Sequence, residues 1–97
     1  MTEVEFNELV VGDIIAVSAS EGFIYLEEIT DVQEHSNLGY TVCTKELILI
    51  DTEGEEYSTK SNTDYYGLQS SPSLSIYDNS YGSLEAIKTK ILLGVYP

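Results

Sequence analysis

The chain has 97 residues and a mass of 10.8 kDa, with seventeen acidic residues, four lysines and no arginine, so its formal net charge is -13. This length suits a single domain, because two independent cores need more chain. Hydrophobic residues make up 42% of the sequence, more than in chains that stay disordered. The single cysteine, Cys43, excludes a disulfide within one monomer and a cysteine-based zinc cluster.

The N-terminal residues MTEVEF lack the basic region and the apolar stretch of a secretory signal. Apolar runs such as residues 47–50 are far shorter than the roughly 20 residues that span a bilayer. We therefore expect a cytoplasmic protein with no membrane partner. Direct binding to nucleic acid is not expected either, because that affinity comes from Lys and Arg side chains that neutralise phosphates.

The negative charge is concentrated in the first part of the chain. Residues 1–56 contain fourteen acids and one lysine, a sum of -13, whereas residues 57–97 contain three acids and three lysines, a sum of zero. A one-signed field steers a partner of opposite charge, although it can also serve solubility alone. As the candidate acidic binding surface we take Glu27, Glu28, Asp31, Glu34, Asp51, Glu53, Glu55 and Glu56.

Four stretches in this acidic part predict β-strands. Residues 3–11 alternate only loosely, but residues 13–17 are apolar on both faces, as in a buried strand. Residues 23–32 predict a longer strand with a bulge near Glu27–Glu28, because Ile29 breaks the alternation. Residues 40–51 are too long for one flat strand and predict a kink near Lys45–Glu46. A polar edge strand is expected at residues 56–60, and turns at 18–22, 36–39 and 52–55.

The last third of the chain changes character. Residues 61–82 are rich in Tyr, Ser, Asn and Gly and predict a long loop region with a short strand at residues 73–77. A helix is expected over residues 83–93, because Ser83 can cap it and Leu84, Ile87 and Ile91 form an apolar stripe. Gly94 is a suitable helix stop. We therefore expect one domain over residues 1–97, made of an acidic barrel-like part (1–60), this loop region and the helix.

The segment LVVGDIIAV at residues 9–17, followed by alternating strands and turns, resembles the start of an SH3-like barrel. The resemblance covers about residues 9–60 and rests on strand lengths and on the Gly-Asp pair before the first core strand. It implies a binding module more often than an enzyme. The expected fold is mainly β, a small curved sheet or SH3-like barrel of about five strands with one C-terminal helix.

No motif for catalysis or cofactor binding is visible. The only histidine, His35, and Cys43 fall on facing strands, at positions roughly 10 Å apart for a two-residue turn at Asn37–Leu38, so a Cys–His dyad is not expected. Counted from Asp51, the EF-hand pattern fails, because Gly falls at position 4 and Asn at position 12. We therefore expect no catalytic residue, no dedicated metal site and no cofactor.

Tyrosine is the other suggestive residue type. The Ser/Asn/Gly-rich stretch contains four of the eight tyrosines, a mixture typical of binding loops, where Tyr supplies rigid contact area. The alternative is that these side chains cover a small core with their hydroxyls in water. The four candidates for an aromatic binding loop are Tyr65, Tyr66, Tyr77 and Tyr81.

These observations favour a non-enzymatic acidic protein that binds the basic surface of a nucleic-acid-binding protein, as an inhibitor or nucleic-acid mimic. In size, charge and lack of catalytic groups the chain is similar to small phage-encoded proteins that block restriction, CRISPR or host transcription machinery. The alternative is a structural or adaptor module that binds a partner, or itself, through the Tyr-rich segment. The edge strand at residues 56–60 could also pair two copies in a homodimer.

Overall fold

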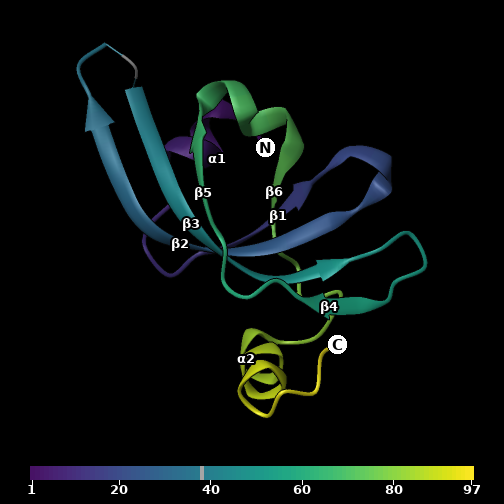
Figure 1. The fold of residues 1–97 in the computed structure, drawn as a ribbon. Coiled ribbons are helices and arrows are strands. Elements are labelled where there is room, and N and C mark those ends of the chain that lie inside the picture. Colours follow the sequence, from purple (N-terminus) through teal and green to yellow (C-terminus); the bar gives the residue numbers. More distant parts are fainter. Residues whose placement is uncertain (38) are drawn as a thin grey trace.

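A computed structural model of the protein describes residues 1–37 and 39–97, and two long antiparallel strands run through it (Figure 1). Strand β2 (Ile24–His35) pairs with β3 (Gly39–Ile50) from Ile24 opposite Ile50 to His35 opposite Gly39. The predicted turn at residues 36–39 joins them, and its central residue Leu38 lies outside the described residues.

Four shorter strands complete an antiparallel sheet. On one side β1 (Ile14–Ser18) pairs with β2, and β6 (Leu74–Ile76) pairs with β1. On the other side β4 (Glu56–Ser58) and β5 (Thr63–Gly67) both pair with β3. Over the part of the chain that is described, β6 forms one edge and β4 with β5 the other, so the sheet is open rather than closed into a barrel.

The β2–β3 pair is interrupted by two bulges. Between Leu26 opposite Ile48 and Glu27 opposite Glu46, β3 contains one extra residue, Leu47. The sequence predicted a kink in this strand near Lys45–Glu46, and the register shift lies directly beside that position. The bulge predicted near Glu27–Glu28 lies in β2 two residues further on, at Thr30. A β-bulge bends its strand and increases the local twist, so the sheet turns at this level.

The second bulge lies in β2. Between Ile29 opposite Thr44 and Asp31 opposite Cys43, the extra residue is Thr30. It places Ile29 and Val32 on the same face of the sheet, where both pack in one apolar cluster. The broken alternation seen in the sequence therefore has a structural cause.

The outer edge of β3 is interrupted at the same level as the bend. Strands β4 and β5 lie end to end along this edge, separated by residues 59–62. Lys60 and Ser61 have φ angles of 57° and 58°, in the left-handed region that few L-residues adopt. The chain stays attached to the sheet here, because the Glu46 N–H donates to the Asn62 carbonyl at 2.7 Å.

Both faces of the sheet are covered. One apolar cluster lies beneath the short helix α1 (Glu3–Asn7) and the 3₁₀ helix η2 (Leu68–Ser73), and the other lies beneath α2 (Leu84–Leu92), on the opposite side in Figure 1. Strand β1 serves both, with Ile15 and Val17 in the first cluster and Ile14 and Ala16 in the second. This is the strand that the sequence predicted to be buried on both faces.

The predicted fold class, a mainly β curved sheet with a C-terminal helix, is confirmed. Helix α2 begins after Ser83, whose hydroxyl accepts the Ala86 N–H, and the short strand in the Tyr-rich segment is β6. That segment also contains β5, a sixth strand where only loop was predicted. The loosely alternating N-terminus is helical, because Thr2 and Glu5 form a capping box. Cys43 is half-buried.

We expect Ile15→Ala to lower the free energy of unfolding by about 2–5 kcal/mol, because Ile15 is fully buried and its truncation leaves a cavity. Ile76 lies directly opposite it on the edge strand β6 and is half-exposed, so Ile76→Ala is the matched control, with a loss below about 1.5 kcal/mol. Urea unfolding followed by circular dichroism measures both. Equal losses would contradict the described packing of β1.

Candidate functional site

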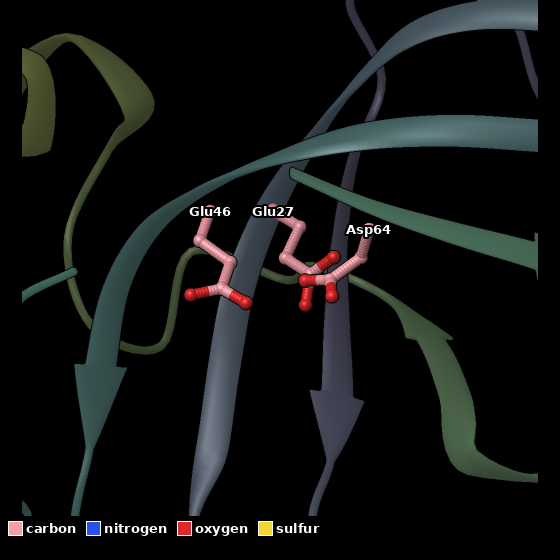
Figure 2. A group of neighbouring side chains, drawn as sticks. All are labelled: Glu27, Glu46 and Asp64. Atoms are coloured by element: carbon pink, nitrogen blue, oxygen red, sulfur yellow. The ribbon is translucent and has the colours of Figure 1, made fainter. Parts of the chain in front are cut away.

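Three carboxylates converge at the bend of the sheet. Glu27 on β2, Glu46 on β3 and Asp64 on β5 each contribute one oxygen to a group whose members all lie within 4.8 Å of one another. Figure 2 shows the three side chains coming from neighbouring strands and pointing to the same side of the sheet. They meet there because the bulges place Glu27 opposite Glu46, while Asp64 lies opposite Thr44.

Glu27 is the innermost member of this carboxylate cluster, and only 1% of its surface is exposed. The Thr44 hydroxyl donates to its Oε1. The Tyr66 hydroxyl lies 3.1 Å from Oε1 and 3.0 Å from Oε2 and also donates to the carboxylate. These two hydroxyls satisfy part of the hydrogen-bonding capacity of a group whose burial is otherwise costly.

Burial and mutual repulsion raise the pKa values in the cluster. Burial raises the pKa of Glu27 to about 7 against the lowering effect of the Thr44 and Tyr66 hydroxyls, and the Asp64 charge adds to the rise. Burial also raises the pKa of Glu46 to about 8, with Asp64 beside it as the next cause. The pKa of the Tyr66 phenol is raised by burial and then by the Glu27 charge. The cluster therefore retains protons near neutral pH.

Within the part of the chain that the structure describes, no lysine forms an ion pair with the cluster, because both ion pairs found there belong to Glu28. Lys60 lines a pocket together with Glu46 but makes no ion pair with it. Carboxylates this close repel one another when they are ionised, and this repulsion adds to the rise in the pKa values of Glu27 and Glu46. Glu27, Glu46 and Asp64 are also the carboxylates close enough together to contact one cation. Three side chains provide about half of the six to eight oxygens that Ca²⁺ takes, and Glu27 already accepts two hydroxyl hydrogen bonds.

The residues of the predicted acidic surface are distributed over three environments. Glu27 is buried, so its carboxylate does not reach the surface. Glu28 points to the opposite face, as expected for adjacent strand residues, where its Oε1 lies 3.1 Å from the Lys88 Nζ and 4.0 Å from the Lys45 Nζ. Asp31 and Glu34 are exposed on the β2–β3 hairpin.

The remaining predicted acids lie in and beside the turn between β3 and β4, at the other end of β3 (Figure 1). Glu53 and Glu55 are exposed, and their backbone N–H groups each donate to the half-buried Asp51 carboxylate at 2.9 Å. Glu56 is half-buried beside Tyr96, and burial together with Glu56 raises the pKa of that phenol to about 12.

A further exposed acid, Glu21, joins the acids of this turn. It precedes Gly22, whose backbone lies against the side chain of Thr52. The turn between β1 and β2 is therefore next to the turn between β3 and β4. The sequence separates these two turns by thirty residues, and only the pairing of β2 with β3 brings them together.

The four tyrosines of the predicted aromatic loop do not share one surface. Tyr65 is 58% exposed, whereas Tyr66 is packed inward with its hydroxyl on Glu27. Tyr77 and Tyr81 pack in the cluster beneath α2, and the Tyr77 hydroxyl donates to the Gly82 carbonyl and accepts the Tyr81 N–H. Of the four, Tyr65 is the one that is exposed to a partner.

His35 and Cys43 lie in different parts of the hairpin. The register places His35 opposite Gly39 and Cys43 opposite Asp31, which is four residues away along β2. The His35 Nε2 is 2.9 Å from the Thr41 hydroxyl. The two side chains are therefore not arranged as a nucleophile and its base.

We expect the free energy of unfolding to fall as the pH rises from about 5 to about 8, and then to level off, through the carboxylate cluster. Glu27 and Glu46 hold their protons more tightly in the folded chain, with pKa values of about 7 and about 8 against the ordinary 4.5. Raising the pH through this range therefore favours the unfolded chain. Urea titrations at several pH values, with a chelator present, measure the slope.

Glu27→Gln should remove part of this slope, because the amide has no proton to lose. The exposed Glu53→Gln, in the turn between β3 and β4, is the matched control and should leave the slope unchanged. A stability that rises with pH between 5 and 8, or a slope that Glu27→Gln does not reduce, would contradict the described cluster.

We expect Tyr66→Phe to lower the free energy of unfolding by about 1–3 kcal/mol, because Glu27 loses a hydroxyl donor inside the protein. Tyr65→Phe, one residue away and exposed, is the control and should change stability by less than about 0.5 kcal/mol. Thermal unfolding of both variants at one pH gives the comparison, and an equal effect would contradict the inward position of Tyr66.

The carboxylate cluster was not predicted from the sequence, because Glu27, Glu46 and Asp64 are far apart along the chain and meet only through strand pairing. No protein-family model matches the chain, and neither a curated protein nor a solved structure matches it. Among residues 1–37 and 39–97, no helix has the length and apolar character needed to cross a bilayer. What the chain does is therefore argued from its own charges and contacts.

Proposed function

We propose that this protein is a non-enzymatic acidic binding protein that occupies the basic, nucleic-acid-binding surface of another protein, as an inhibitor or nucleic-acid mimic. The observation that carries the proposal is that the exposed carboxylates form no ion pair with a lysine among the described residues. Both ion pairs within the described ranges involve Glu28, so the acids exposed on the hairpin and on the turns have no internal cation. Their charge is available to a partner.

The spacing of these acids also supports the proposal. Asp31 and Glu34 lie opposite Cys43 and Tyr40, toward the first end of β3. Glu21, Glu53 and Glu55 belong to the two turns beside its other end, and Figure 1 shows the two ends of this strand. The longest dimension of the protein is 43 Å, which exceeds the roughly 34 Å of one turn of duplex DNA. Two acidic groups at the two ends of the bent β2–β3 pair can therefore contact separate basic patches that normally bind phosphates of one nucleic-acid segment.

The experiment is capture of proteins from a bacterial lysate on the immobilised protein, followed by elution with excess duplex DNA. We expect nucleic-acid enzymes that DNA or high salt displaces, because both compete for the same basic surface. Neutralising three turn acids should reduce the amount retained by at least about tenfold, since phosphate-like contacts act together. The three substitutions are Glu21→Gln, Glu53→Gln and Glu55→Gln.

A variant with the same change in net charge at other exposed acids is the matched control, made of Glu3→Gln, Glu8→Gln and Glu85→Gln. It should retain the partner. If both variants lose it equally, the binding is a general effect of charge, and if DNA and salt displace nothing, the proposal of a mimic fails.

The alternative, an adaptor that binds through its aromatic residues, now depends on Tyr65. This side chain is exposed on β5, at the edge of the sheet, where a partner could contact it. Capture that resists salt and is lost in Tyr65→Ala, but not in the turn variant, would favour the adaptor.

A further inference from the structure

Two of the four lysines of the protein line one groove, whereas Lys60 lines another pocket and Lys90 lies over the Tyr96 ring. The four lysines are Lys45 on β3, Lys60 between β4 and β5, and Lys88 and Lys90 on α2. A groove of about 270 Å³ lies between these elements and is lined by Lys45, Leu47, Ser61, Lys88, Ile91 and Leu92. We call it the lysine groove. Its walls combine apolar side chains with two ammonium groups, and Leu92 is 86% exposed.

The ammonium groups of the lysine groove are only partly neutralised. The Glu28 Oε1 lies 3.1 Å from the Lys88 Nζ and 4.0 Å from the Lys45 Nζ. One carboxylate between two ammonium groups leaves one positive charge without a partner. An occupant that offers an apolar side chain together with carboxylates would complement the groove in both respects.

The chain itself has such a surface on α1. Val4 is 65% exposed, and the exposed Glu3 and Glu5 are its sequence neighbours. Glu8 lies four residues after Val4, so it is one helical turn away on the same side as Val4. We call this surface the α1 face. Phe6 is buried beneath the helix, so the α1 face directs an apolar side chain surrounded by three carboxylates toward solvent.

The α1 face and the lysine groove lie on opposite sides of the sheet, because α1 covers one apolar cluster and α2 covers the other (Figure 1). One molecule therefore cannot bring its own two surfaces together. We propose that copies of this chain associate head to tail, with the α1 face of one copy seated on the lysine groove of the next. Such a contact is heterologous, so each copy in a chain of molecules keeps one free surface of each kind.

Sedimentation equilibrium of the full chain at increasing concentration tests the association. We expect the weight-average mass to rise above the 10.8 kDa of the monomer. Leu92→Glu and Val4→Asp should each weaken association by at least about tenfold, because each places a carboxylate where the contact requires an apolar side chain. Both positions are exposed, so circular dichroism should show an unchanged fold. Val11→Asp is the matched control, since Val11 is 62% exposed and belongs to neither surface.

A mixture of the two variants distinguishes a head-to-tail contact from a symmetric one. Leu92→Glu retains its α1 face and Val4→Asp retains its lysine groove, so an equimolar mixture should form dimers and nothing larger. A wild-type chain that stays monomeric up to about 1 mM would overturn the proposal. A Val4→Asp variant that associates as well as the wild type would also overturn it, because this is the result expected for a symmetric contact through α2.

Discussion

The bend in the β2–β3 pair determines where the other elements of the chain can lie. Two twelve-residue strands without interruption would form a continuous twisted ribbon with two exposed faces. The extra residue Leu47 in β3, and the break between β4 and β5 beside it, turn the sheet at one level. Beyond the turn, one face receives α1 and η2 and the other receives α2. The protein therefore builds two small apolar clusters from one pair of strands.

The same irregularities create the carboxylate cluster. Continuing the register of Val32 opposite Val42 along β2 would place Glu27 opposite Leu47. The bulge at Thr30 shifts the pairing by one residue, so Glu27 lies opposite Glu46 instead. Two acids on adjacent strands are destabilising when both are ionised. The hydroxyls of Thr44 and Tyr66, and the protons that the cluster retains, make this pairing compatible with folding.

The elements that were predicted correctly are those whose hydrophobic pattern or capping residue lies within the element itself. Residues 13–17 are apolar on both faces wherever they pair, and Ser83 with the stripe at Leu84, Ile87 and Ile91 is a sufficient helix signal. Helix α1 was missed because five residues are too few for a periodic pattern, although the Thr2–Glu5 capping box was a visible signal. Strand β5 was missed because TDYYG is polar and becomes a strand through pairing with β3.

The candidate site was less predictable than the fold for a related reason. Glu27, Glu46 and Asp64 come from three strands, and their meeting depends on a bulge whose effect on register the sequence does not specify. Glu21 joins the acids of the second turn only through the position of Gly22 against Thr52. In both cases the residue types were evident, but their proximity required the pairing of distant strands.

The acidic residues of this small chain therefore fall into two groups, one buried with raised pKa values and one exposed on the surface. Where carboxylates meet at the bend, burial raises their pKa values, and they hold protons near neutral pH. Where they lie on the turns and the hairpin, they are exposed to water, and no lysine among residues 1–37 and 39–97 forms an ion pair with them. The formal charge of -13 counts both groups alike, but an approaching partner meets chiefly the second. The proposed basic partner would therefore bind at the ends of β3, while the buried acids at its centre link the stability of the sheet to pH.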